Sequence, residues 1–296
     1  MFFKKVLASI CCFYLIFPCF IRCKEWEKIT QFETLQKRIL DKIECYKNDK
    51  DNILVIWDVD GVLVVSKSAI FYYNDLYVNV FCKRLLNIDR EKKTKLKSIV
   101  YQKDPERPVN SNIPAFIQTL QKQGIKNIAL TATPPGKYGE IESFEDLRIE
   151  SLKKNGFDFR NSFPNIPFIQ LQEDPSIIFK DCAVLSGKCK KGWAQQLLLS
   201  SLYRDINWVP KLIIFIDDQS TNLDSIQESC KHLLRDDHPI DCLCLHFCIK
   251  PENLPPPDSA LAEFQVTWLL SHQEWLPDEQ ARKKINSPCA CLCSYL

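Results

Sequence analysis

Residues 53–63 read ILVIWDVDGVL, and this stretch decides how the rest of the chain is interpreted. Its first part, Ile53 to Trp57, is a continuous apolar run, which is typical of a short strand buried on both faces of a parallel sheet. Asp58, Asp60 and Gly61 follow that strand directly. Ligands bind beyond the carboxyl ends of the strands in such sheets, so these two acids are the first candidates for a functional site.

The alternation of strands and helices continues along the chain. We predict further strands at 127–130, 211–216 and 241–247, and helices at 24–48, 113–123, 144–154, 191–205, 223–234 and 259–271. Short apolar runs that alternate with amphipathic helices indicate an α/β fold, in which helices cover both faces of a mostly parallel sheet. The length of 296 residues and the hydrophobic content of 46% are sufficient for a sizeable core.

Acids or a hydroxyl follow two further strands. Thr131 follows the run NIAL, and Asp217 and Asp218 follow the run LIIFI. Carboxylates that converge on one edge of a sheet repel each other, so they need a cation or must be partly protonated. An oxygen-only ligand set favours a hard ion, and Mg²⁺ is the best candidate. A carboxylate can also act as a nucleophile and form an acyl-phosphate.

These segments together resemble the haloacid dehalogenase-like (HAD) hydrolase superfamily. IWDVDGVL resembles its first motif, NIALT its second and FIDDQSTN its acidic fourth motif, in the same order along residues 52–247. The resemblance implies a Rossmann-like three-layer fold. It also implies an Mg²⁺-dependent phosphatase, which hydrolyses a small phosphomonoester through an aspartyl-phosphate intermediate.

The resemblance assigns a role to each matching residue. Asp58 would be the nucleophile and a metal ligand. Asp60 would be the general acid and then the general base, and its backbone carbonyl would also reach the metal. Asp217 would bind the metal, with Asp218 as a ligand directly or through water. Thr131 would bind the phosphate.

The superfamily also uses a lysine, for which SGKCKKGW offers three candidates: Lys188, Lys190 and Lys191. Lys191 is the best placed, because it begins the predicted helix that precedes the strand of Asp217. A helix N-terminus there would help to hold the phosphate. Asn222, just after the acidic motif, either positions a ligand or caps the following helix.

Residues 66–109 exceed what the minimal fold requires, and we expect them to form a small helical cap insertion. Residues 24–65 and 110–296 would then form the core. The aromatic side chains of the insertion, which either contact the substrate or pack against the core, are Phe71, Tyr72, Tyr73 and Tyr77.

Residues 1–23 have the pattern of an export signal or a membrane anchor, because Lys4 and Lys5 precede an apolar run. The alternative is a buried N-terminal helix. With this segment, the general layout of the chain and the KG step at Lys191 and Gly192 before a helix resemble exported HAD-like bacterial proteins of undefined function. That resemblance implies the periplasm or cell envelope of a Gram-negative bacterium, or secretion, with membrane contact only through an uncleaved N-terminal segment. A net charge of +2 gives no support for a nucleic-acid partner.

The chain has 15 cysteines, and an odd number of them remains when residues 1–23 are removed. One group of possible zinc ligands lies along the predicted strand 241–247 and just after it: Cys242, Cys244, His246 and Cys248. Four ligands along one extended strand cannot surround a zinc ion, so packing within the sheet is the better interpretation. A second group of cysteines lies near the C-terminus: Cys289, Cys291 and Cys293. These cysteines either form disulfides, within the chain or with another chain, or hold a metal.

Two other functions remain open at this point. The chain can be a HAD-like binding protein or host-directed effector that keeps the fold without turnover, although intact Asp58 and Asp60 argue against that. It can also be a phosphotransferase that passes the phosphoryl group to an alcohol. The oligomeric state stays undetermined.

Overall fold

The computed structural model describes residues 26–171, 174, 176–235, 238–251 and 254–287. A sheet of eight strands occupies its centre. From one edge to the other, the strands are β1 (Trp26–Ile29), β12 (Asp241–Phe247), β9 (Leu212–Asp217), β2 (Ile53–Trp57), β5 (Lys126–Thr131), β8 (Ala183–Leu185), β7 (Ile178–Lys180) and β6 (Phe168–Gln170). The first six strands of this order pair with their neighbours in parallel. Strand β7 pairs antiparallel with β8, and β6 pairs antiparallel with β7. The predicted α/β class with a mostly parallel sheet is confirmed.

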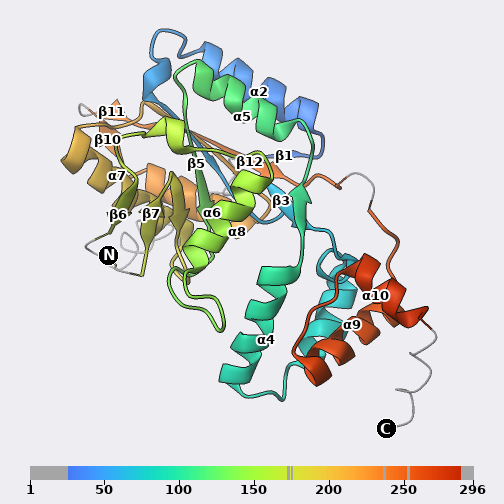
Figure 1. Ribbon diagram of the computed structural model, residues 1–296. Helices are drawn as coiled ribbons and strands as arrows, with labels where there is room; N and C mark the ends of the chain where they lie inside the picture. The colour runs from blue at the N-terminus through green and yellow to red at the C-terminus, as the bar shows by residue number, and fades with distance from the viewer. Residues whose placement is uncertain (1–25, 172–173, 175, 236–237, 252–253, 288–296) are drawn as a thin grey trace, which may run out of the picture.

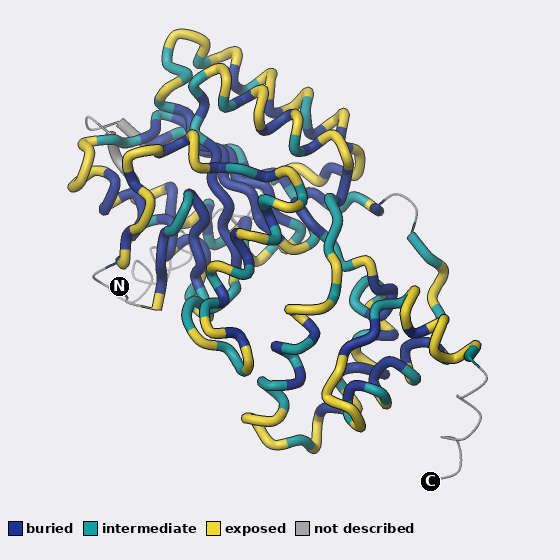
Figure 2. Tube along the Cα trace, viewed as in Figure 1, coloured by how far each residue is buried: buried dark blue, intermediate teal, exposed yellow. Residues whose placement is uncertain are grey.

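The apolar strands β2 and β9 are fully buried because helices cover both faces of the sheet (Figures 1 and 2). Helices α2 (Phe32–Glu44) and α5 (Ile113–Lys122) lie side by side on one face. Helices α7 (Lys191–Ile206) and α8 (Ser220–Cys230) pack against each other on the opposite face. The other elements around the sheet are η1 (Lys50–Asn52), α6 (Phe144–Lys154), η4 (Arg160–Ser162), β10 (Leu234–Arg235) and β11 (His238–Pro239).

A helical lobe stands beside the sheet and is joined to it by the antiparallel pair β3 (Val64–Ser66) and β4 (Glu106–Pro108). Its helices are η2 (Ala69–Phe71), α3 (Asn74–Leu76), the π-helix η3 (Tyr77–Cys82), α4 (Arg90–Lys103), α9 (Ser259–His272) and α10 (Asp278–Ile285). Buried side chains of the 66–109 segment and of the C-terminal helices form one apolar cluster, which includes Leu76, Phe81, Val266 and Trp275.

This packing differs from the division expected from the sequence. Residues 66–109 do form helices outside the sheet, but they do not form the lobe alone. Helices α9 and α10, which the sequence placed with the core, pack on these residues instead. The physical reason is that the 66–109 segment presents an apolar face, and Val266 and Leu269 of α9 cover it.

The helix predicted over residues 24–48 is wrong at its start. Residues 26–29 form the edge strand β1, which pairs in parallel with β12, and α2 begins only at Phe32. Strand pairing outweighs the helical spacing there. The predictions for residues 1–23 and for Cys289, Cys291 and Cys293 lie outside the described residues. Within the described part of the chain, we find no helix with the length and apolar character that crossing a membrane requires.

Candidate functional site

Three of the predicted acids meet at the carboxyl ends of β2 and β9. Asp58, Asp217 and Asp218 each offer one carboxylate oxygen, and these oxygens lie within 4.8 Å of one another. The two strands are hydrogen-bonded neighbours, and the Asp58 amide continues the pairing by donating to the Ile216 carbonyl at 2.9 Å. Asp58 is only 4% exposed and Asp217 is fully buried. These three residues form what we call the acid cluster.

Lys191 lies inside the acid cluster. Its Nζ is 2.5 Å from Asp58 Oδ1 and 2.7 Å from Asp217 Oδ2, and the side chain is buried. Lys191 is the first residue of α7, as the sequence predicted. The alternatives Lys188 and Lys190 lie instead along a surface hollow between α7 and α8. Of the three candidate lysines, Lys191 is therefore the one that lies among the acids, and its partners are Asp58 and Asp217.

One ammonium does not balance three carboxylates, of which Asp58 and Asp217 are buried and Asp218 is partly buried. Burial raises the pKa of Asp58 to about 8, against the opposing effect of Lys191 and with a further increase from Asp217. Burial and the neighbouring Asp217 raise the pKa of Asp218 to about 6. Burial acts to lower the pKa of Lys191, but its two acid partners outweigh that effect and hold it above its usual value. A second cation would favour the ionised acids.

The orientation of the cluster suits an oxygen-binding ion. The Oδ1 atom of Asp218 is buried and has no hydrogen-bond partner among the described residues. A buried carboxylate oxygen without a donor is costly unless a cation or a proton satisfies it. The cluster can therefore hold a metal ion, and its all-oxygen ligand set is of the kind that hard divalent cations prefer.

Asp217 is fixed by two donors from the start of α8. Its Oδ1 accepts from the Gln219 amide at 2.8 Å, and the Asn222 side-chain amide lies 3.1 Å from both carboxylate oxygens. Asn222 is inside α8, whose N-cap is Gln219, so it does not cap that helix. Of its two predicted roles, the positioning of a site residue is the one that the structure supports.

Gly61 allows the turn after β2 to pass close to Asp218. Its φ is +82°, and a Cβ at this position would lie 2.6 Å from Asp218 Oδ2. Only glycine adopts this conformation without strain and leaves room for the carboxylate. The Gly of the DVDG segment is thus a requirement of the site.

Thr131 ends β5, the strand beside β2, and is buried at the same edge of the sheet as Asp58. Its hydroxyl accepts a hydrogen bond from the Thr133 amide at 3.1 Å and lies 3.0 Å from the Thr133 hydroxyl. These two threonines form a small hydroxyl pair at the end of β5.

The side chain of Asp60 lies outside the acid cluster, which corrects the expected convergence of four carboxylates. It forms an ion pair with Arg148 of α6, and it is 66% exposed. Arg148 is buried, and its other terminal nitrogen is 2.5 Å from Glu106 Oε1 in β4. Ser151 also donates to Glu106. The cation draws Asp60 away from the other acids.

Sequence reasoning missed Arg148. Burial acts against its charge, but Asp60 and Glu106 outweigh that effect and raise the pKa of its guanidinium above the usual value. One signal was present in the sequence, because Phe144, Arg148 and Leu152 share one face of the predicted helix. A cation on an apolar helix face indicates a buried partner, but the sequence alone does not say which acid that is.

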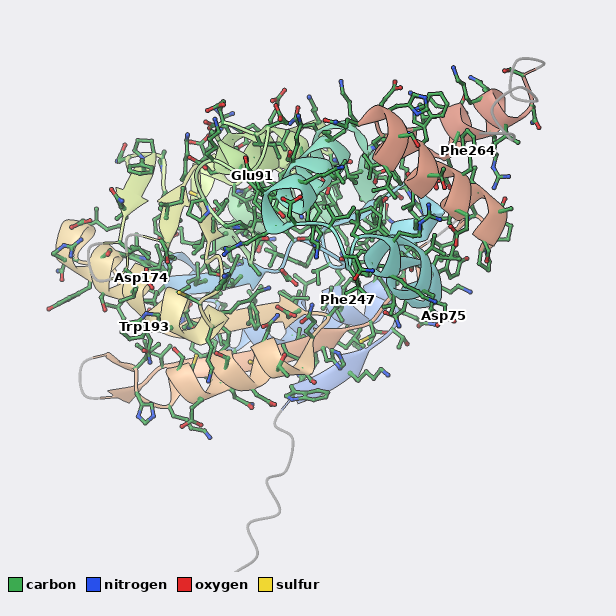
Figure 3. All side chains as sticks on the ribbon, turned by 90° about the horizontal axis from the view of Figure 1, so that it is seen from below. Asp75, Glu91, Asp174, Trp193, Phe247 and Phe264 are labelled. Atoms are coloured by element: carbon green, nitrogen blue, oxygen red, sulfur yellow. The ribbon has the colours of Figure 1, made fainter. Side chains whose placement is uncertain are left out.

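A cleft of about 570 Å³ separates the acid cluster from the helical lobe. Asp60, Gly61, Asp218 and Gln219 line its core side, together with Phe247, which lies between the sheet and the lobe (Figure 3). The lobe contributes aromatic side chains, namely Phe71, Tyr72, Tyr77, Phe81 and Tyr101. Of the four aromatic residues singled out in the sequence, Tyr73 does not line the cleft, and its hydroxyl donates to the Pro255 carbonyl at 2.7 Å.

The cysteines of β12 do not form a metal site. Among the described residues, the acid cluster is the one group of three or more candidate metal ligands that comes together. The Cys242 and Cys244 sulfurs are 3.7 Å apart, and Cys244 is buried in the core. Cys248 Sγ lies 3.0 Å from His246 Nε2, which is 2.8 Å from the Asp218 carbonyl. The strand-packing interpretation fits Cys242 and Cys244, whereas Cys248 borders the cleft.

Fold and site together define an α/β protein with a buried acid cluster, able to hold a metal ion, under a helical lobe. The family model described as "Protein of unknown function (DUF2608)" matches residues 28–282, so the chain belongs to that family. An uncharacterized protein of Rickettsia conorii is 26% identical over 213 residues, which cover 68% of this chain and 71% of the relative. Another from Rickettsia bellii is 24% identical over 219 residues, which cover 67% and 73%. No solved structure matches.

Proposed function

We propose that this protein is a phosphohydrolase of the HAD type that binds Mg²⁺ and hydrolyses a small phosphomonoester. The observation that carries the proposal is the acid cluster: three carboxylates at two paired strand ends offer oxygens within 4.8 Å, and one buried lysine pairs with two of them. An arrangement with excess negative charge, from which Asp218 reaches the cleft, favours binding of a cation. A phosphate ester that enters the cleft would then meet Asp58 beside that cation.

Asp58 is the nucleophile in this proposal. One of its carboxylate oxygens forms a bond to phosphorus, and the bond between phosphorus and the ester oxygen breaks. The departing alcohol takes a proton from Asp60, which lines the cleft. Water then attacks the phosphorus of the acyl-phosphate and gives its proton to Asp60, which releases phosphate and regenerates Asp58.

The remaining residues hold the reactants. Asp58, Asp217 and Asp218 would hold Mg²⁺, which when bound offsets the repulsion between Asp58 and the phosphate. Lys191 orients Asp58 and adds positive charge beside the phosphate, and Thr131 supplies a hydroxyl at the neighbouring strand end. Arg148 fixes the carboxylate of Asp60.

The test is phosphate release from a panel of phosphomonoesters with Mg²⁺ and with EDTA. We expect release only with the metal, a loss of at least about 1,000-fold in Asp58→Asn, and a smaller loss in Asp60→Asn. Asp41→Asn is a matched control, because Asp41 is exposed on α2 and belongs neither to the acid cluster nor to the cleft lining. An Asp58→Asn protein with wild-type activity would refute the mechanism.

A non-catalytic binding protein is the second candidate, and one observation favours it. The side chain of Asp60 is engaged by Arg148 instead of standing beside Asp58. If the Asp60 side chain does not approach the leaving group when a phosphate is bound, proton transfer to that group fails. Binding of Mg²⁺ and inorganic phosphate without turnover of any ester would support this candidate. Transfer to an added alcohol, beyond hydrolysis, would instead identify a phosphotransferase.

A further inference from the structure

The lobe side of the cleft carries aromatic rings beside Lys97, Val100 and Asp104. The lobe supplies five of them, and the cleft also reaches Asp60 and Asp218 on the core side. A substrate whose phosphate lies at the acid cluster must therefore place its alcohol part against these rings. The chemistry of that side of the cleft selects among alcohols.

The five rings divide into two groups by their contacts. Phe71 and Phe81 pack against Trp275, with ring centroids 5.2 and 6.4 Å away, and so hold the lobe together. Tyr77 belongs with them, because its ring stacks on Phe81 at 5.8 Å. Tyr72 has one ring neighbour, Tyr73, in an edge contact at 5.6 Å. Tyr101 is half exposed although its ring also touches Tyr138 and Phe144. Tyr72 and Tyr101 are thus the rings with surface to offer to a ligand.

The hydroxyls of Tyr72 and Tyr101 make no hydrogen bond to any other described residue, whereas the Tyr73 hydroxyl donates to the Pro255 carbonyl. Tyrosine presents a rigid ring for stacking and a hydroxyl that donates or accepts. A flat ring that carries polar substituents would satisfy both parts of these side chains.

The core side of the cleft also has an apolar part, beside Asp60 and Asp218. We call it the apolar wall, and its residues are Val64, Val65, Phe247 and Ile249. A ring placed between this wall and the tyrosines loses its contact with water on both faces. A cleft of about 570 Å³ is of the size that encloses a small molecule. It accommodates a single ring system together with its phosphate.

We propose that the substrate is a phosphomonoester whose alcohol carries an aromatic ring, which inserts between Tyr72, Tyr101 and the apolar wall. This inference rests on the proposed phosphohydrolase function and adds the class of leaving group to it. Two sources share this chemistry: arylalkyl alcohols and nucleosides.

The experiment compares kcat/KM for esters of primary alcohols, so that the leaving groups differ little in basicity. The substrates are benzyl phosphate, cyclohexylmethyl phosphate, ethyl phosphate and adenosine 5′-monophosphate. We expect benzyl phosphate to exceed ethyl phosphate by about 10-fold or more, and the cyclohexyl ester, which matches it in size, by about 3-fold. A higher value for the nucleotide than for benzyl phosphate identifies nucleosides as the source.

Substitutions of Tyr72 and Tyr101 test whether these two rings cause the preference for the benzyl ester. Tyr72→Ala combined with Tyr101→Ala should remove the preference for benzyl over ethyl phosphate, because the loss of the rings lowers kcat/KM for the benzyl ester more than for the small ethyl ester. Tyr203→Ala is the matched control, since Tyr203 is an exposed tyrosine on α7 that does not line the cleft. Wild-type and variant unfolding curves check that the fold is retained.

A binding measurement keeps the inference separate from catalysis. Calorimetry with benzylphosphonate and ethylphosphonate, in Mg²⁺ and in EDTA, should show tighter binding of the benzyl compound, and the double variant should lose that difference. Turnover with equal values for the benzyl, cyclohexyl and ethyl esters overturns the inference and leaves the proposed function intact. Absence of both turnover and phosphonate binding overturns the proposed function itself.

Discussion

Arg148 supports a stability prediction that the structure makes in detail. Its side chain is 7% exposed and pairs with Glu106, which is 19% exposed, and with Asp60, which is 66% exposed. Arg148→Met keeps an unbranched apolar stem but removes the charge. Glu106 is then a largely buried acid whose remaining side-chain donor is Ser151.

The magnitude follows from the exposure of the two acids. Loss of one partner from a buried ion pair costs about 3–5 kcal/mol, because the other charge stays buried without compensation. The contact with Asp60 adds no more than about 1 kcal/mol, because that acid is solvated. Since Ser151 still donates to Glu106, we expect Arg148→Met to lower the free energy of unfolding by about 3 kcal/mol, measured by urea denaturation.

A second substitution distinguishes this reason from a general loss of packing. Glu106→Gln in the Arg148→Met background removes the uncompensated charge and keeps an acceptor for Ser151, so about 1–2 kcal/mol should return. A loss below about 1 kcal/mol in Arg148→Met, or equal stability of the single and double variants, would refute the reasoning. The activity of Arg148→Met should also fall with an altered pH profile, because Asp60 is no longer fixed.

Three further predictions concern the acid cluster. Asn222→Leu removes the amide that bonds both oxygens of Asp217, so the Kd for Mg²⁺ should rise about 10-fold or more by calorimetry. Gly61→Ala puts a Cβ against Asp218 at a positive φ, so we expect a loss of about 1–3 kcal/mol in urea unfolding together with weaker Mg²⁺ binding. Because the pKa of Asp58 is raised to about 8, this acid keeps its proton at pH 7 and releases it to the solvent when the metal binds. Mg²⁺ affinity should therefore increase from pH 6 to 8 and then level off, and calorimetry in buffers of different ionisation enthalpy should detect about one released proton at pH 7.

The sheet and most of the acid cluster were predictable because the signals are local. Strands β2 and β9 are unbroken apolar runs, and the acids follow them at once, so parallel pairing brings Asp58 and Asp217 together without any further information. Lys191 was predictable for the same reason, since it begins a helix whose position the sheet determines. The three short strands β8, β7 and β6 were missed because each has only three residues, too few for a periodic pattern.

The direction of the Asp60 side chain was not predictable, because it depends on a partner that is distant along the chain. Arg148 lies 88 residues away from Asp60 and 42 from Glu106. Nothing near Asp60 in the sequence indicates this cation. Convergence at a sheet edge brings backbones together, but charge pairing with other elements decides where each carboxylate points.

The helical lobe depends on contacts between residues that are still farther apart in the sequence. Asp104, at the base of the lobe, connects its first residues to those that follow α9. Asp104 accepts hydrogen bonds from the hydroxyls of Ser66 and Ser68, which precede the helices of the lobe. It also accepts one from the indole of Trp275, which follows α9, at 3.0 Å. The same Trp275 ring supports Phe71 on the cleft wall. The family match ends at residue 282, within α10 and well beyond the last strand of the sheet. The unit shared by the family therefore includes the helices that hold the aromatic wall in place over the acid cluster.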